Sequence, residues 1–303
     1  MKILQYRNTV RLYVVTVRLV TAKLSGFLRL IRPANCLMMG FAVLVGASLA
    51  KESMFSQEVS MRLLLGFLTA FTLTGASMAV NDYYDREIDR INAPNHPIPS
   101  GLIKPEDALV FAIILAVIGV IAASLINTLC LLTAVVSWII SVVYATSGKR
   151  TGLLGNFLVS TCVAIPFIYG SIVVVGTVKS NVLIFASMAF LSNTGREITK
   201  GIVDVPGDRV KGVRTVAVSY GERIAAFVAT LLYLVAVFLS GLPVMFGLVS
   251  FWFIPPVVVA DVGFIVSSIW LVCEPTRENA RRVKNLVLVW MMMGLISFIL
   301  GSI

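Results

Sequence analysis

Charged residues are scarce in this chain. Only 13% of its 303 residues are Asp, Glu, Lys or Arg, and it has a single histidine. A soluble domain has about a quarter of its residues charged. Here 58% of the residues are hydrophobic, the mean hydropathy is +0.94, and no polar stretch is long enough for a separate soluble domain. The composition excludes a soluble protein and predicts an integral membrane protein.

Cysteine is also sparse, and the cysteines are not grouped. The four are scattered through or beside apolar segments, at Cys36, Cys130, Cys162 and Cys273. Disulfide frameworks and zinc sites need cysteines at short, regular spacings. We therefore expect neither, and read these cysteines as small packing residues.

Apolar segments recur along the chain, each about as long as the ~20 residues that a helix needs to cross a bilayer. We predict an all-α membrane protein with about nine transmembrane helices around a central cavity, in a single domain over 33–303. A basic segment, 1–32, precedes it and is predicted to lie as an amphipathic helix on the membrane surface. The predicted spans are 33–50, 62–82, 106–126, 128–146, 154–177, 181–203, 223–241, 244–271 and 284–302.

The positive charges agree with this count if the N-terminus lies in the cytoplasm. Of the 25 Lys and Arg, Lys51, Arg62 and Lys179 fall on the opposite side. Arg196 and Lys200 lie within a predicted span. The others lie on or next to predicted cytoplasmic loops, which is a strong positive-inside bias. Membrane topology thus accounts for the net charge of +10, and no nucleic-acid partner is expected.

The chain has 15 acidic residues, and four of them fall in the stretch NDYYDREID at 81–89, which closes a long apolar run. On a helix, Asp82, Asp85 and Asp89 share one face, with Asn81 one turn before Asp85. Carboxylates this close repel one another unless something positive lies between them. Oxygen ligands of this kind suit Mg²⁺, which usually bridges to substrate phosphates.

A second acidic cluster, DVPGD at 204–208, ends a later predicted span on the same side of the membrane. Both clusters carry an Asp-x-x-x-Asp-Arg pattern, which indicates a weak internal duplication with two halves facing each other; chance similarity is the alternative. Asp204 and Asp208 would complete a Mg²⁺–diphosphate site. The alternative is that these acids are only the solvated ends of helices. Pro206 is expected to end or kink the helix, so that Asp208 would reach the metal from a loop.

Ionisable residues also occur inside the span that leads to the second cluster. Arg196, Glu197 and Lys200 lie upstream of Asp204 on one predicted helix. Charges within a span are costly and usually mark function, although pairing of Glu197 with Lys200 as a structural lock is the alternative.

Other candidates lie in loops or among the aromatic residues. The loop with Lys149 and Arg150 is suited to grip phosphate oxygens, or only fixes the topology, and Arg32 has the same ambiguity. His96 lies in a proline-rich loop and is read as a surface residue. Aromatic faces shelter cations, but ordinary packing is the alternative for Tyr83, Tyr84, Trp138, Tyr144, Phe157, Phe167, Tyr169 and Phe190.

Taken together, these motifs resemble the UbiA superfamily of intramembrane prenyltransferases. The resemblance covers most of the chain and is carried by 81–101, by YATSGKR with the following Asn156, and by 196–221. It implies nine helices around a cavity, with Mg²⁺ and the diphosphate of an isoprenyl donor bound by two Asp-rich motifs. The implied metal ligands are Asn81, Asp82, Asp85, Asp89, Asp204 and Asp208. The implied diphosphate contacts include Lys149 and Arg150, with Arg32 and Tyr144 as weaker candidates. With the residues selected above, the expected diphosphate contacts are Asn81, Lys149, Arg150, Arg32, Tyr144 and Arg196, and the expected catalytic residues are Asp85, Asp204, Lys149, Glu197 and Lys200.

Within the superfamily, the second motif is most similar to archaeal enzymes that transfer a geranylgeranyl group to the sn-2 hydroxyl of geranylgeranylglyceryl phosphate. This implies a geranylgeranyl diphosphate donor, a lipid acceptor and a membrane site facing the cytoplasm. The residue that removes the acceptor proton stays open between Glu197 and the aspartates. His96 is a departure, because the family usually has arginine before Pro97.

Other functions were weighed against this one. Acceptors such as 4-hydroxybenzoate, homogentisate or a chlorophyllide are the first alternative. An ion-coupled transporter is less favoured, because transporters place their acids near mid-bilayer. A CDP-alcohol phosphotransferase is not favoured either, since its D-G-x-x-A-R run is absent from the sequence.

Overall fold

The computed structural model describes residues 21–50, 57–210 and 212–301, and this part of the chain is helical, without β-strands. The predicted all-α class is therefore confirmed. Residues 21–31 are helical, while 1–20 of the predicted surface helix lie outside the described residues. The long helices are α2 (Pro33–Ala50), α3 (Gln57–Asn92), α4 (Pro105–Ser124), α5 (Thr128–Thr146), α6 (Leu153–Val175), α7 (Ser180–Val210), α9 (Glu222–Met245), α10 (Ile254–Cys273) and α11 (Arg277–Gly301). The short helices are η1 (Gly148–Thr151), α8 (Val216–Tyr220) and η2 (Phe251–Phe253).

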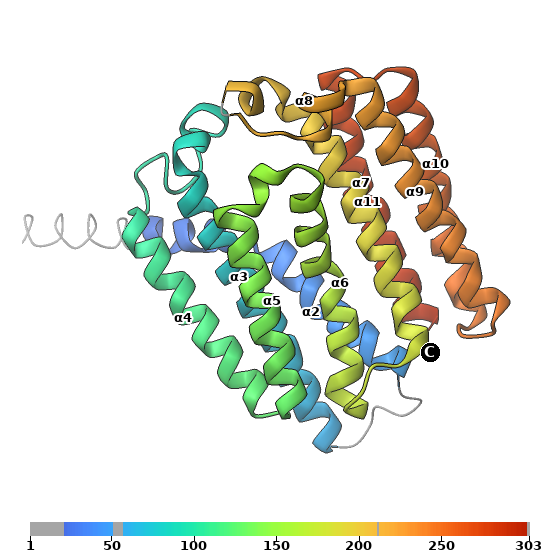
Figure 1. Ribbon diagram of the computed structural model, residues 1–303. Helices are drawn as coiled ribbons and strands as arrows, with labels where there is room; N and C mark the ends of the chain where they lie inside the picture. The colour runs from blue at the N-terminus through green and yellow to red at the C-terminus, as the bar shows by residue number, and fades with distance from the viewer. Residues whose placement is uncertain (1–20, 51–56, 211, 302–303) are drawn as a thin grey trace, which may run out of the picture.

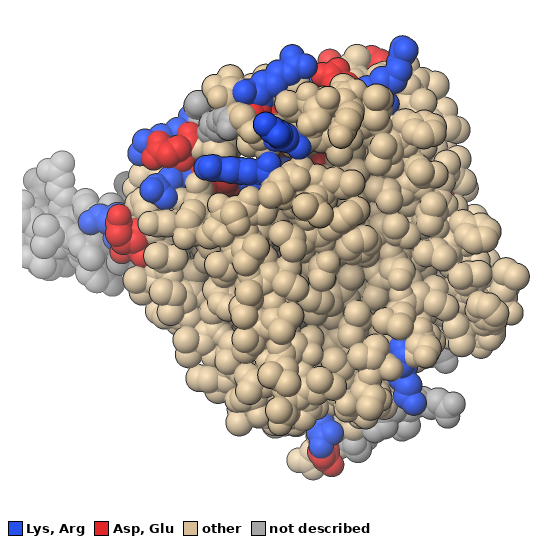
Figure 2. All heavy atoms as spheres, viewed as in Figure 1, with Lys and Arg blue, Asp and Glu red and all other residues tan. Residues whose placement is uncertain are grey.

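In the described part of the chain, eight helices are long and apolar enough to cross a membrane, which makes this a multi-pass membrane protein. α7 is not among them: its second half carries Arg196, Glu197 and Lys200. The count of nine crossings therefore stays a prediction. Figure 2 shows an uncharged belt on the visible face, with most of the Lys, Arg, Asp and Glu along one edge and a few at the opposite edge.

Successive helices run in alternating directions, so that their connections lie on two sides of the bundle (Figure 1). The C-terminal ends of α3 and α7, together with η1 and α8, lie on one side. The α4–α5 and α6–α7 connections lie on the other. The two acidic stretches, at the ends of α3 and α7, therefore reach the same side of the protein, as predicted.

Close packing of α2 against α6 depends on two glycines. A Cβ on Gly46 would lie 1.9 Å from the carbonyl oxygen of Phe167, and one on Gly170 would lie 2.0 Å from that of Val43. Small residues let helix backbones approach in this way inside membranes. A cluster of aromatic rings then joins this pair to the C-terminal helices, through Phe167, Phe185, Phe253 and Phe298.

Several predicted span ends are wrong. Hydropathy marks the bilayer core, and α3 and α11 continue past it, whereas the start predicted at 244 falls in the last turn of α9. α3 extends ten residues beyond the predicted end at 82, so the whole acidic stretch is helical. The span predicted from 244 begins at Ile254, after a turn at Gly247, whose φ is +62°. α11 begins at Arg277 rather than 284, which places its first basic residues on a helix.

α7 also continues through Pro206 to Val210. Of the two alternatives for Pro206, an end of the helix before Asp208 is wrong, and so is the loop position expected for Asp208; a kink at Pro206 stays a prediction. A proline removes one backbone hydrogen bond, and a long helix held by its neighbours tolerates that loss.

Candidate active site

A polar cavity of about 340 Å³ lies among α2, α3, α5, α6, α7 and α11. Asn81 and Tyr144 line it, as the sequence predicted. Its charged lining comprises four basic side chains and one acidic one: Arg32, Arg196, Lys200, Lys284 and Glu197. Because charges inside a bilayer are costly unless matched, this excess of positive charge indicates a site for an anion.

The first acid of the α3 motif is held by Arg32. Asp82 is 3% exposed, and its Oδ1 accepts a hydrogen bond of 2.7 Å from the Arg32 guanidinium. Arg32 lies between the helical residues 21–31 and α2, with φ of +51°. That conformation is rare for a residue with a side chain, and Pro33 disfavours the α-helical alternative. The strained junction directs Arg32 toward both Asp82 and the cavity.

The second acid, Asp85, joins α3 to the basic loop. Lys149 of η1 forms an ion pair with its Oδ2, which also accepts a hydrogen bond of 3.0 Å from Asn81 Nδ2. This bond leaves Asn81 Oδ1 buried and without a partner among the described residues. A free amide oxygen next to carboxylates is the kind of donor that Mg²⁺ binds, so these residues fit the predicted metal.

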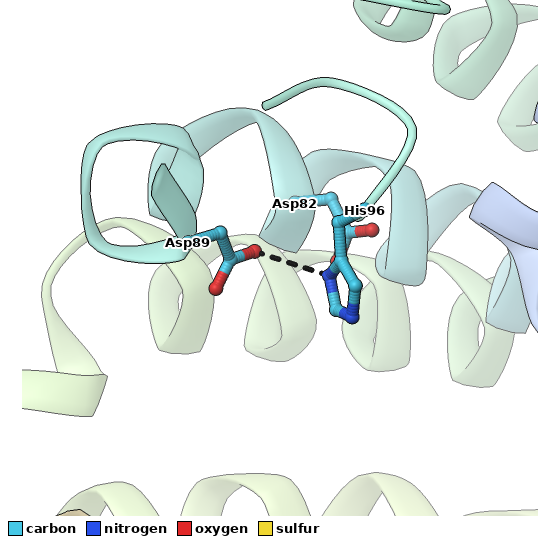
Figure 3. Close-up of side chains that lie close together, drawn as sticks. All are labelled: Asp82, Asp89 and His96. Atoms are coloured by element: carbon cyan, nitrogen blue, oxygen red, sulfur yellow. Dashed lines mark ion pairs between the residues drawn. The ribbon is translucent and has the colours of Figure 1, made fainter. Parts of the chain in front are cut away.

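The third acid, Asp89, lies beside the proline-rich loop. Asp89 Oδ2 and His96 Nδ1 are 3.5 Å apart, and Figure 3 shows the imidazole turned toward the carboxylate. Ligand atoms of Asp82, Asp89 and His96 all lie within 4.8 Å of one another, the one such group in the described part of the chain. The sequence analysis read His96 as a surface residue and so missed this contact.

The position of η1 is set by a glycine. Gly152 has φ of +65°, and a Cβ there would lie 2.1 Å from the carbonyl oxygen of Arg214. The basic loop therefore packs directly against the segment that follows α7. Lys149 is thus held beside the α3 motif, whereas Arg150 is exposed; neither lines the cavity.

The α7 side of the cavity carries a compact ionic group. Glu197 Oε1 accepts a hydrogen bond of 3.0 Å from Arg196, and Oε2 accepts one of 3.3 Å from Lys200. The predicted pairing of Glu197 with Lys200 is thus present, and it lies in the cavity wall. Arg196 Nε is buried and has no hydrogen-bond partner within the described residues.

Asp204 and Asp208 lie further along α7, beyond the cavity lining. Both are half-buried. Neither belongs to the three-residue group at the end of α3. Their role as metal ligands stays a prediction, as does the sharing of one metal between the two motifs.

A second, apolar chamber of about 70 Å³ adjoins the polar cavity. The two share Met38, Met39, Val163 and Met291 in their walls. Of the aromatic candidates, Trp138, Tyr144 and Tyr169 line the polar cavity and Phe167 lines the chamber. Besides His96, Lys284 was not predicted as a site residue, because it is the first residue of the last predicted span, 284–302. The signal that could have indicated a site is the position of Lys284 at the start of an apolar helix, because a cation there lies at the edge of the membrane core.

Fold and site together define a helical membrane protein with a cavity lined mainly by basic charges and an adjoining apolar chamber. The model of the UbiA prenyltransferase family matches residues 39–295, and the chain belongs to this family. The predicted class of enzyme is confirmed at that level.

Individual relatives give a closer comparison. A digeranylgeranylglyceryl phosphate synthase of Archaeoglobus fulgidus is 38% identical over 293 residues, which cover 95% of this chain and 99% of that protein. A solved structure described as a digeranylgeranylglyceryl phosphate synthase is 31% identical, with a TM-score of 0.74, over 92% of this chain and 98% of its own. The structure of a UbiA homolog from Archaeoglobus fulgidus, bound to GPP and Mg²⁺, is 18% identical with a TM-score of 0.62. The match covers 90% of this chain and 99% of that one, and it supports the fold alone.

Proposed function

We propose that this protein transfers a geranylgeranyl group from geranylgeranyl diphosphate to the sn-2 hydroxyl of geranylgeranylglyceryl phosphate. This is the step that its relatives' name describes. The observation that carries the proposal is a cavity that combines an anion site with an adjoining apolar chamber. Both substrates have an anionic head group, which suits the anion site, and an isoprenoid chain, which suits the apolar chamber.

The donor diphosphate is assigned to the α3 side of the cavity. Asn81, Asp82, Asp85 and Asp89, with Asp204 and Asp208 from α7, would hold Mg²⁺ there. When bound, the metal neutralises the charge that develops on the leaving diphosphate. Lys149 then stabilises the same charge from the basic loop, and the nearby Arg32 acts in the same way.

Transfer begins with cleavage of the bond between C1 and the diphosphate oxygen. Trp138, Tyr144 and Tyr169 present aromatic rings to the cavity, and such rings stabilise an allylic cation. The acceptor oxygen attacks C1 and loses its proton. Glu197 is the one carboxylate among the cavity-lining residues, so it is proposed to take that proton.

The site is proposed to face the cytoplasm. The support is the positive-inside bias, because the basic loops and both acidic motifs lie on the same side of the helices. Protease accessibility of the loop at 93–104, measured in inside-out and right-side-out vesicles, tests this orientation.

The activity is tested by offering purified protein geranylgeranyl diphosphate with three acceptors in parallel. Geranylgeranylglyceryl phosphate is expected to be consumed with release of diphosphate. Consumption of 4-hydroxybenzoate or a chlorophyllide instead would support the aromatic-acceptor alternative. Absence of diphosphate release with every acceptor would contradict the proposal.

A further inference from the structure

Lys284 is a half-buried cation in the cavity wall that the mechanism above does not use. It comes from α11, which packs against α7. Among the ion pairs of the described residues none includes Lys284, whereas Lys200 and Arg196 both pair with Glu197. Together with the unpartnered Nε of Arg196, it gives the α7–α11 wall hydrogen-bond donors in excess of acceptors.

The acidic motif at the end of α3, next to the cavity, has the opposite character. Its three aspartates already have Arg32, Lys149 and His96 as partners. An anion bound there needs an added cation, which the donor diphosphate would bring with its metal. The reaction has a second anionic head group, the acceptor phosphate, and the cavity-lining side chains of Arg196 and Lys284 can bind it without a metal.

α11 also continues from this cation into an apolar surface. Lys284, Leu288 and Met291 line the polar cavity from one face of the helix. The same face then lines the chamber with Met291, Gly294, Leu295 and Phe298. At 1.5 Å per residue this run is roughly 21 Å long, more than the roughly 15 Å that one leaflet's hydrocarbon occupies. A charged head followed by an isoprenoid chain fits this order.

We propose that Lys284 and Arg196 form the binding site for the acceptor's phosphate group, with the acceptor's isoprenoid chain running along α11 into the apolar chamber. This assignment rests on the proposed function. It separates the two substrates by their head groups: the donor lies against α3, and the acceptor lies against α7 and α11.

Equilibrium binding of the acceptor tests the assignment without turnover. Purified protein, with chelator and without donor, is titrated with geranylgeranylglyceryl phosphate and with geranylgeranylglycerol, which lacks the phosphate. Lys284→Met is expected to raise the Kd of the phosphate about tenfold, because it removes a charge-assisted hydrogen bond. Lys284→Arg is expected to restore binding to within about threefold, and the alcohol is expected to bind equally to all variants.

Two controls make the result specific. Arg281→Met removes an exposed charge one turn earlier on α11 and is expected to leave every Kd unchanged. The KM for geranylgeranyl diphosphate, measured with Mg²⁺, is expected to stay within about threefold in Lys284→Met.

The outcomes separate the two proposals. An unchanged phosphate Kd in Lys284→Met, an equal loss for the alcohol, or a rise in donor KM as large as the effect on the acceptor would each overturn the head-group site alone. A wild-type protein that turns over the donor with another acceptor, and does not bind geranylgeranylglyceryl phosphate, would overturn both.

Discussion

The acidic motif at the end of α3 and the α7–α11 wall of the polar cavity differ in how their charges are balanced. In the α3 motif, which adjoins the cavity through Arg32 and Asn81, the side chains of Asp82, Asp85 and Asp89 each have a basic partner from another segment of the chain. On α7, Glu197 alone is shared by two basic residues, and Lys284 of α11 adds a further one. Two anionic substrates can therefore be bound differently at one site: the α3 motif needs a metal to bind an anion, and the basic side chains of the α7–α11 wall do not.

Metal removal gives the largest expected effect. Chelation should lower turnover by about 10³-fold or more, because a bound metal contributes several kcal/mol to stabilisation of the leaving group. Added Mg²⁺ should restore it. Acceptor binding, measured as its Kd in the same chelator, should remain. Turnover that persists in the chelator, or acceptor binding that vanishes with it, would remove the distinction between the α3 motif and the α7–α11 wall.

Asp85→Asn should have the next largest effect. The neutral amide no longer holds Lys149 or contributes charge to the metal, and loss of one stabilising group costs about 100-fold in kcat. The assay is diphosphate release, with the thermal midpoint as a check on folding. Glu87→Gln is the matched control, since this exposed acid of the same helix pairs only with neighbouring arginines. An equal loss of diphosphate release in both variants would show that any charge removed from α3 lowers activity, and would contradict a specific role for Asp85.

Gly294→Phe should raise the KM for the acceptor about tenfold. A Cβ at Gly294 meets nothing within 4 Å, and the residue lines the apolar chamber, so a phenyl ring would occupy space assigned to the isoprenoid chain. KM should rise for a twenty-carbon acceptor chain and change less for a ten-carbon one. Gly241→Phe of α9 is the control, because its Cβ is also unobstructed but lines neither cavity. An equal rise in KM for both chain lengths would contradict the placement of the acceptor's isoprenoid chain in the apolar chamber.

His96→Ala should have the smallest effect. The imidazole lies 3.5 Å from Asp89 in the three-residue group, so its loss should raise the Mg²⁺ concentration for half-maximal rate several-fold. The rate at saturating Mg²⁺ should change little. His96→Arg, which restores the residue usual in the family, shows whether a permanent charge serves equally well. An unchanged Mg²⁺ dependence in His96→Ala would return His96 to the surface role read from the sequence.

The sequence by itself determined the membrane class, the common side of the two acidic motifs and four of the five charged residues that line the polar cavity. It did so because bilayer thickness sets the length of apolar runs and helical periodicity places Asp82, Asp85 and Asp89 on one face. Charge bias along the loops added the orientation, which remains a proposal. Arg196, Glu197 and Lys200 could be selected as candidates because charges inside a span are costly.

Only the tertiary structure decided which charges meet. Arg32 reaches Asp82 across 50 residues, and His96 comes beside Asp89 because the proline-rich loop folds back over α3. Lys284 faces the cavity because α11 begins seven residues earlier than hydropathy indicates and packs against α7. Such contacts depend on how helices pack and how loops return, and a one-dimensional pattern of apolar and polar residues does not contain that information.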